Sequence, residues 1–407
     1  MTRCYRVSIW ASLLFAGFLW PQLPRADADM LLQLPRPVAE KRINVATEPG
    51  ANFGEKLHSC IRRLVPQGGT CDALSISGAQ AVTDDPFSGA VGRLRVLLGN
   101  VTIDSLDAWR LPDDMELAGN GSGTMLRLAP GASKDLIRNA GGIRGNRRIS
   151  IHDLTLDGNN ANQTGPASTI HLNNVSDFTI ERVTVLNSMV HGIALDDGCI
   201  HGKLLMNRIE GVKSGSGIRA GDIPPRGSVA FLEIRENEIS KVAGAGGILV
   251  LGATPGSGHT LNISIAGNTI TGIQGASIEV GDGAQKVTVT GNKIELRGAP
   301  GGSSGSTGIA VRSAQNVRVS DNTVSGDTTE HEQTGIRAWS PATDHGGTLS
   351  EVTMENNSVS DIGGYGIKVD SGKAIHIVKN TVRRSTKNNI YVAPKATGVT
   401  QQGNVLE

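Results

Sequence analysis

A short apolar pattern recurs along most of the chain. It consists of an isoleucine followed two positions later by a second apolar residue, and glycine often precedes it. Nine copies recur at an interval of roughly 25 residues, which is typical of solenoid repeats. Because successive side chains of a strand point to opposite faces, each copy predicts a strand with one buried face. The isoleucines of the nine copies are Ile170, Ile193, Ile218, Ile248, Ile278, Ile309, Ile336, Ile367 and Ile390.

A second pattern lies between these copies and contains an asparagine. It reads apolar-x-apolar-x-x-Asn-x-apolar, as in residues 263–270. Asparagine tolerates the left-handed backbone of a sharp corner, and stacked asparagines can hydrogen-bond to one another as a ladder. Leu154 and Val183 occupy the equivalent place in the first copies, so the ladder is expected to begin at Asn207. The asparagines are Asn207, Asn237, Asn268, Asn292, Asn322, Asn357, Asn380 and Asn404.

The two patterns together predict an all-β fold. Two or three strands per repeat, with no helical pattern between them, make one coil of a β-solenoid. We expect regular coils over residues 141–407, and an N-terminal cap with irregular first coils over residues 29–140. Within the cap, residues 55–65 have the apolar spacing of a helix and are followed by Pro66 and two glycines. A short helix that covers the open end of the solenoid is therefore expected there.

The N-terminal segment 1–28 resembles a secretory signal peptide. Arg3 and Arg6 precede an apolar run over residues 7–20, and small residues at 26–28 fit a cleavage site. A membrane anchor is the alternative, but a spanning helix needs roughly 20 apolar residues. The two arginines are not adjacent, which argues against a twin-arginine signal. We expect Sec-type export, a secreted or periplasmic protein, and no membrane span after signal cleavage.

The cysteines agree with an exported protein. Cys4 would leave with the signal peptide, and disulfides persist outside the cytoplasm. Cys60 and Cys71 flank the turn at residues 66–69 and are expected to pair. Cys199 is expected to be a small buried apolar residue rather than a catalytic thiol.

Composition excludes two classes of partner. The 407 residues contain 39 basic and 38 acidic side chains, and the net charge is +1. This balance provides no positive surface for nucleic acid or an anionic membrane. The 53 glycines permit many tight turns, and with 3% aromatic residues there are few bulky side chains for a conventional core.

Several segments resemble the pectate-lyase superfamily. Residues 60–73, 95–100 and 117–121 are similar to its N-terminal part, and residues 149–159 are similar to the region it shares with polygalacturonases and alginate epimerases. The resemblance implies a right-handed parallel β-helix that acts on an acidic polysaccharide outside the cytoplasm.

The motifs of particular enzymes in that superfamily are not matched. Polygalacturonases carry Asn-Thr-Asp, Gly-Asp-Asp and Gly-His-Gly in that order, whereas this chain has only Asp196-Asp197 and an isolated His191-Gly192. The epimerase pattern Tyr-Gly-Phe-Asp-Pro-His would fall at residues 191–196 and differs there. The resemblance therefore concerns the fold and the class of substrate rather than one reaction.

One group of polar residues is the candidate active site. The residue one position after each isoleucine faces outward, polar residues follow three and four positions after it, and stacking at about 4.8 Å per coil joins them into one patch. The candidate catalytic residues are His171, His191, Asp196, Asp197, Arg219 and Asp222. The candidate Ca²⁺ ligands are Asp157, Asp197 and Asp222.

Two reactions fit this patch. In β-elimination on a uronate, Ca²⁺ or an acid neutralises the sugar carboxylate, and Arg219 or a neutral histidine removes the C5 proton. In hydrolysis, Asp196 or Asp197 would pair with Asp222 as the two carboxyl groups. Crowding is expected to raise the carboxyl pKa values. The structural alternative is that these aspartates cap turns, because Asp-Asp-Gly and Gly-Asp are ordinary turn sequences.

A second outward patch is the candidate substrate-binding surface. Its tryptophan can stack on a sugar ring, and its cations can pair with sugar carboxylates. A solvated face of compensating ion pairs is the alternative. The residues are Glu279, Arg312, Arg337, Trp339 and Lys368, with Asp282 beside them.

The leading functional hypothesis is an exported polysaccharide lyase or glycoside hydrolase that acts on a uronate-containing polysaccharide. The competing hypothesis is a non-catalytic, adhesin-like β-helix that binds glycan, because a fold does not determine a function.

Overall fold

Three strands make up each coil of the chain in the computed structural model. A typical coil contains β14 (Val175–Glu181), β15 (Thr184–Leu186) and β16 (Ile193–Asp196), and the next coil begins at β17 (Ile200–Leu205). The described residues are 40–221, 229–252, 261–298, 305–341 and 347–407. The predicted signal peptide and Asp222 lie outside them.

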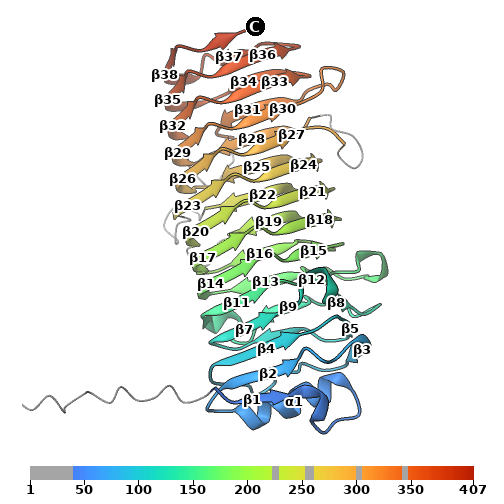
Figure 1. Cartoon of the computed structure of the whole chain (residues 1–407). Coiled ribbons are helices and arrows are strands. Elements are labelled where there is room, and N and C mark those ends of the chain that lie inside the picture. The colour runs from blue at the N-terminus through green and yellow to red at the C-terminus, as the bar shows by residue number, and fades with distance from the viewer. Residues whose placement is uncertain (1–39, 222–228, 253–260, 299–304, 342–346) are drawn as a thin grey trace, which may run out of the picture. The chain divides into compact units, whose positions relative to one another are not determined.

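Equivalent strands of successive coils pair in parallel and form three long sheets, here called sheets A, B and C (Figure 1). Sheet A contains β1 (Arg42–Asn44), β2 (Gly69–Ala73), β4 (Leu94–Leu98), β7 (Met115–Ala118), β10 (Asn146–Arg147), β11 (Ile149–His152), β14, β17, β20 (Ala230–Arg235), β23 (Leu261–Ala266), β26 (Gln285–Thr290), β29 (Gln315–Ser320), β32 (Ser350–Glu355), β35 (Gly372–Val378) and β38 (Ala396–Gln402).

The other two sheets complete each coil. Sheet B contains β3 (Gly78–Val82), β5 (Val101–Ser105), β8 (Met125–Leu128), β12 (Thr155–Asp157), β15, β18 (Arg208–Val212), β21 (Glu238–Val242), β24 (Thr269–Ile273), β27 (Lys293–Glu295), β30 (Thr323–Ser325), β33 (Ser358–Ile362), β36 (Thr381–Ser385) and β39 (Val405–Leu406). Sheet C contains β6 (Trp109–Leu111), β9 (Ile137–Asn139), β13 (Ile170–Asn173), β16, β19 (Ser216–Ala220), β22 (Gly246–Leu251), β25 (Ala276–Gly281), β28 (Thr307–Arg312), β31 (Thr334–Trp339), β34 (Tyr365–Val369) and β37 (Ile390–Val392).

The repeated isoleucines form one row of the core. Ile193 pairs with Ile170 on one side and with Ile218 on the other, and the same register continues to Ile390. The first eight isoleucines are fully buried, and Ile390 in the last coil is half-buried. The predicted all-β, right-handed parallel β-helix is therefore confirmed.

A helix covers the N-terminal end of the coils, as predicted. Helix α1 (Phe53–Leu64) buries Phe53, Leu57, Ile61 and Leu64. It begins two residues earlier than the spacing indicated, because the Asn52 side chain caps it by accepting a hydrogen bond from the Glu55 backbone N–H at 3.0 Å. Four 3₁₀ turns lie between residues 45 and 162, at Val45–Thr47, Gly121–Gly123, Gly142–Arg144 and Asn160–Asn162.

The predictions for Cys60, Cys71 and Cys199 are confirmed. A disulfide joins Cys60 of α1 to Cys71 of β2. Cys199 is buried and not in a disulfide, and its burial raises the pKa of the thiol to about 12. A thiol with this pKa is not a nucleophile at neutral pH.

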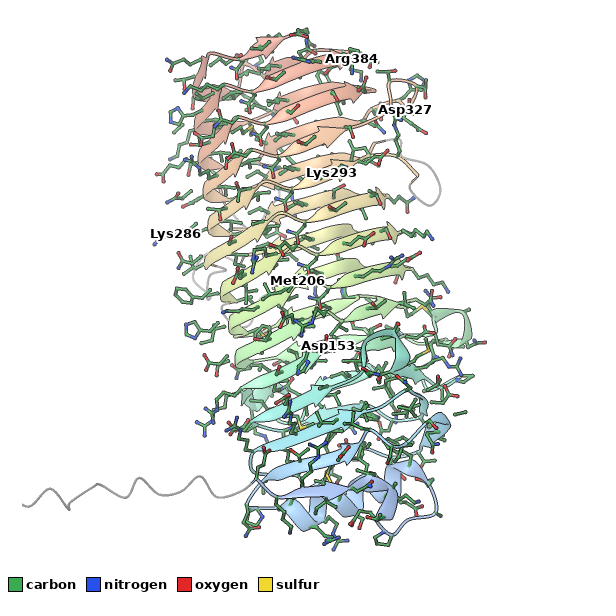
Figure 2. The ribbon with its side chains drawn as sticks, in the orientation of Figure 1. Asp153, Met206, Lys286, Lys293, Asp327 and Arg384 are labelled. Carbon is green, nitrogen blue, oxygen red and sulfur yellow. A yellow bond between two sulfur atoms is a disulfide. The ribbon has the colours of Figure 1, made fainter. Side chains whose placement is uncertain are left out.

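The asparagine ladder is present and begins at Asn207. The side chain of Asn207 donates to Asn237 Oδ1 at 3.0 Å, and the same contact recurs in each later coil to Asn404. The conformational explanation was wrong, because the left-handed residue is the one before each asparagine. Met206 has this position before Asn207, and Asp153 has it in an earlier coil, before Leu154 (Figure 2). The ladder asparagines from Asn207 to Asn380 are buried with their side chains hydrogen-bonded, and the left-handed angle belongs to the residue before each of them.

None of the helices in the described part of the chain has the length and apolar character that crossing a bilayer requires.

Candidate functional site

The first candidate patch lies on the outer face of sheet C, across β13, β16 and β19. His171 pairs in register with Ala194, and Ala194 pairs with Arg219. The small Ala194 side chain leaves room above it for the longer side chains on either side. The structure therefore brings together His171, Asp196 and Arg219 from three successive coils.

His171 is held between two carboxylates. Its Nε2 lies 2.9 Å from Asp196 Oδ2, and its Nδ1 lies 3.0 Å from Asp135 Oδ2. Arg219 Nη2 donates to both oxygens of Asp196 at 2.7 Å. These four side chains, here called the ion-pair network, expose between 6% and 22% of their surface.

The ion-pair network determines its own charge states. Burial lowers the pKa of His171, but the hydrogen bonds and charges of Asp135 and Asp196 outweigh burial and raise the pKa to about 9. Burial raises the pKa values of both carboxyls, and their hydrogen bonds to His171, with Arg219 beside Asp196, bring them below the ordinary value. The expected increase of the carboxyl pKa values is therefore wrong for Asp196. At neutral pH the network holds two cations and two anions.

His191 is the neutral histidine of this region. Burial, followed by the charge of Arg219, lowers its pKa to about 4. Its Nδ1 accepts a hydrogen bond from the Ser216 backbone N–H at 3.0 Å. Because that nitrogen accepts, Nε2 carries the proton, and the imidazole presents a donor rather than a free lone pair.

The remaining predicted residues of the first patch are dispersed. Asp197 has a left-handed backbone with φ of 34° and accepts from Asn173 Nδ2 at 3.4 Å. Asp157 ends β12 on sheet B, where it accepts from the Asn159 backbone N–H at 2.8 Å and from Asn187 Nδ2 at 3.1 Å. Asp157 has the turn-capping role of the structural alternative.

The described residues do not form a calcium site. Asp157 and Asp197 lie in different parts of the coil, and the oxygens of Asp196 are engaged by Arg219 and His171. The part of the chain that the structure describes contains no group of three or more acidic, histidine or cysteine side chains placed to hold a metal ion. Binding of Ca²⁺ stays a prediction that depends on Asp222, outside that part.

The second patch lies further along sheet C and consists partly of ion pairs. Arg312 contacts Glu279 at 2.8 Å and Asp282 at 2.9 Å. Arg337 and Lys368 contact Asp370 at 2.8 and 3.1 Å. These contacts agree with the predicted alternative of compensating charges.

The last three coils add aromatic rings to this patch. The Arg337 guanidinium carbon lies 4.5 Å from the centre of the Trp339 ring. The ammonium groups of Lys368 and Lys387 lie 4.8 and 5.2 Å from the Tyr365 ring, whose centre is 5.4 Å from that of Tyr391. The aromatic–cation cluster is defined as Arg337, Trp339, Tyr365, Lys368, Lys387 and Tyr391.

The comparison with protein families identifies the repeats. Residues 225–406 match the family model described as a right handed beta helix region. The chain is a right-handed parallel β-helix protein. No curated protein matches its sequence significantly.

Solved structures share this fold at low sequence identity. The β-helix superposes on the A-module of the mannuronan C-5 epimerase AlgE6 from Azotobacter vinelandii with a TM-score of 0.64 and 18% identity, covering 89% of this chain and 99% of that one. For the surface protein and adhesin PfbA from Streptococcus pneumoniae, the TM-score is 0.61, the identity is 12%, and the coverage is 90% and 97%. The catalytic domain of a GH87 alpha-1,3-glucanase in complex with nigerose gives 0.54 and 14%, with coverage of 90% and 69%. At these identities the similarity shows the fold alone.

The sequence patterns missed two contributors to the outer face of sheet C. Asp135 lies two residues before Ile137, and Ile137 pairs with Ile170 as an earlier row of the same core. The interval between these two isoleucines is longer than any interval within the nine copies. Tyr365 lies two residues before Ile367, at the start of β34, where the repeat predicts no outward side chain. A longer permitted interval between repeats would have identified Asp135 from the sequence. A count of the few aromatic residues outside the apolar pattern would have indicated Tyr365.

The β-helix therefore offers two different kinds of chemistry on one face. In the ion-pair network, both nitrogens of His171 and both oxygens of Asp196 are engaged in hydrogen bonds. The aromatic–cation cluster instead presents ring faces and cationic groups, which are the groups that bind sugars and their carboxylates.

Proposed function

We propose that this β-helix binds an acidic polysaccharide along the outer face of sheet C, at the aromatic–cation cluster. The observation that carries the proposal is the concentration of aromatic rings there. Four Phe, Tyr or Trp side chains in the described residues are not buried, and Trp339, Tyr365 and Tyr391 are three of them. In a chain with 3% aromatic residues, this grouping requires a reason.

The chemistry of the aromatic–cation cluster suits a sugar acid. A ring face stacks on the apolar face of a sugar, and Arg337, Lys368 and Lys387 can pair with carboxylates. Among the described residues, Asp370 is the carboxylate that contacts two of these cations, Arg337 and Lys368. Positive charge beside stacked rings favours a uronate-containing chain over a neutral one.

The names of the structural neighbours support a polysaccharide ligand in general terms. They include an epimerase of mannuronan, an adhesin and an α-1,3-glucanase. The proposal includes export of the chain by its N-terminal segment, since such polymers lie outside the cytoplasm. An adhesin-like binder is the function that the described geometry supports best.

A polysaccharide lyase or glycoside hydrolase is the second candidate. Residues with shifted pKa values are common at functional sites. On this face the pKa of His171 is raised and the pKa of His191 is lowered. Binding is the leading proposal because His171 is protonated and hydrogen-bonded at both nitrogens, so it cannot accept the C5 proton of a uronate.

The test is binding of the purified full chain to polygalacturonate, alginate and a neutral glucan. Trp339→Ala and Tyr365→Ala are expected to weaken binding to the acidic polymers about tenfold each. Lys293→Ala, at an exposed position on sheet B, is the matched control and should leave binding unchanged. Equal binding of the neutral glucan, or full binding by both aromatic variants, would refute the proposal.

The same preparations test turnover. Ultraviolet absorbance of unsaturated ends reports a lyase and new reducing ends report a hydrolase, each measured with and without Ca²⁺. If the chain is an enzyme, Asp197→Ala should abolish the signal without lowering the melting temperature. Absence of both signals, with binding retained, would eliminate the second candidate.

A further inference from the structure

A polar hollow lies at the corner where the chain passes from sheet C to sheet A. Its volume is about 290 Å³. The lining residues used below are Arg144, Arg147, Asp113, Ser176 and Ile200. It is separate from the aromatic–cation cluster, which lies on β31, β34 and β37 and on the turn between β36 and β37.

The charges of this hollow favour an anion. Arg144 is exposed, and its side chain makes no hydrogen bond or ion pair with the described residues. Arg147 has a long contact of 3.7 Å with Asp113. Asp113 Oδ1 already accepts from Asn146 Nδ2 at 2.7 Å and from the Arg147 backbone N–H at 3.1 Å. Two guanidinium groups are therefore opposed by one carboxylate that has other partners.

An exposed ring pair continues the same corner. The rings of His201 and Phe231 are 5.1 Å apart and tilted by 34°. Phe231 is 52% exposed, and the His201 side chain is 54% exposed. His201 Nδ1 lies 3.5 Å from Asp177 Oδ1, so one exposed carboxylate stands beside the ring pair, and both rings are accessible to a ligand that stacks on them.

The backbone at Phe231 follows a corner that recurs from coil to coil. Phe231 has a φ of 55°, in the left-handed region that bulky residues avoid. The equivalent residues of the neighbouring coils, His201, Asn262, Lys286 and Asn316, have φ between 53° and 55°, so the left-handed corner belongs to the coil and is not special to Phe231. The feature particular to this coil is that an aromatic ring stands at the corner and stays exposed there, beside the ring of His201 from the preceding coil.

Strand register places the hollow and the ring pair in one line. Arg147 pairs with Ser176, Ser176 with Ile200, and Ile200 with Ala230. Three steps between coils separate Arg147 from the strand that carries Phe231, or about 14 Å. A short oligosaccharide spans that length.

We propose that this corner is a second binding site, which takes a carboxylate-bearing oligosaccharide. Arg144 and Arg147 pair with a sugar carboxylate in the hollow, and the His201–Phe231 pair stacks on a ring further along the same chain. The site deepens the proposed function and takes from it only the acidic nature of the ligand. Either site can exist without the other.

The test uses tetragalacturonate as the probe and a neutral galactose tetrasaccharide as its control. Binding to the full chain is measured by calorimetry, and the His201 ring signal is followed by NMR. Phe231→Asn keeps the left-handed backbone without strain, so the fold should be retained. This variant and the Arg144→Gln/Arg147→Gln double variant are each expected to weaken binding at the corner about tenfold.

The two sites give different results in the aromatic–cation variants. Trp339→Ala should leave the shift of the His201 signal by tetragalacturonate unchanged, even where polymer binding is lost. A His201 signal that does not move at saturating tetragalacturonate overturns the corner site. The same holds if the neutral tetrasaccharide moves the signal equally, or if both corner variants keep full affinity at the corner.

Discussion

At the scale of single residues, His171 shows how burial and charge compete. Burial alone would keep this imidazole neutral, but Asp135 and Asp196 supply two anions within hydrogen-bonding distance. The result is a cation with a pKa of about 9, whereas His191 on the same face has a pKa of about 4. The two histidines therefore hold opposite charge states at neutral pH.

The first prediction concerns the pH dependence of stability. The folded pKa of His171 lies above the unfolded value of 6.5, so its stabilisation is complete below pH 6.5 and is lost as pH rises through 9. We expect the free energy of unfolding to fall by up to about 3 kcal/mol between pH 6.5 and 10. Urea unfolding at several pH values across this range measures this decrease in the free energy of unfolding.

Asp135→Asn separates this effect from other titrations. The amide keeps the shape of the side chain and removes one of the two anions, so the pKa of His171 should decrease toward its ordinary value. An NMR titration of the His171 ring checks this decrease. A wild-type midpoint near 6.5 would contradict the charge assignment.

At the scale of the elements, the corner between sheets A and B depends on a buried polar row. Asn268 Oδ1 accepts from the backbone N–H and the side chain of Asn237, both at 2.9 Å, and its Nδ2 donates to Ile234 O at 3.0 Å. Each asparagine thus joins two coils and satisfies backbone groups that lie away from water.

The second prediction is that loss of a central ladder residue is costly. Asn268→Ala leaves several buried partners without hydrogen bonds and should destabilise the fold by about 3 kcal/mol. Asn207→Val is the matched control, because the next coil toward the N-terminus has Val183 in the same place. We expect a smaller loss there, measured by urea unfolding. Equal losses would show that the ladder does not stabilise the corner cooperatively.

A glycine precedes most of the core isoleucines because a neighbouring strand approaches it too closely for a side chain. A Cβ atom at Gly335 would lie 2.4 Å from Val359 Cγ1 and 2.5 Å from Gly366 O. Strands of sheets B and C meet at this point, and no side chain fits between them.

The third prediction follows from that contact. Gly335→Ala should lower stability by about 2 kcal/mol or more, because backbone must move to admit the methyl group. Gly291→Asn is the control, since Gly291 faces open space with a φ of 64° and Asn356 adopts that conformation in a later coil. The measurement is the melting temperature of each variant. An unchanged melting temperature for Gly335→Ala would contradict the close approach.

At the scale of the whole molecule, the two ends of the coil stack differ. Figure 1 shows α1 at the N-terminal end. This helix buries four large apolar side chains, and a disulfide joins it to β2. At the other end, Val405 and Leu406 of β39 are 47% and 51% exposed. In a solenoid each coil is stabilised by its neighbours, and in the described residues β39 pairs with β36 on one side.

The fourth prediction compares these ends. Cys71→Ser removes the disulfide and should lower the free energy of unfolding by about 3 kcal/mol, since the cross-link limits the unfolded chain. Cys199→Ser is the matched control for a cysteine outside any disulfide. Hydrogen exchange should show β37–β39 opening before β1–β4 in the unmodified protein. Slower exchange at the C-terminal end would contradict the asymmetry.

Much of the fold was predictable because its causes are local and periodic. Alternating apolar residues define strands, and repetition at nearly constant spacing brings equivalent strands together, so the solenoid, the ladder asparagines and the capping helix follow from the sequence. The Cys60–Cys71 pair also follows, because a short loop keeps the two residues close.

The candidate site was predictable only in part, because its properties depend on atoms from several coils. The repeat brought His171 and Arg219 onto one face, but Asp135 comes from an earlier coil, outside the spacing of the repeat, and together with Asp196 it raises the pKa of His171. The rings of Tyr365 and Tyr391 meet because of the register between the last coils. The sequence determined which strands stack, and only the tertiary structure decided which side chains meet, since contact distances and burial set hydrogen bonds and pKa values.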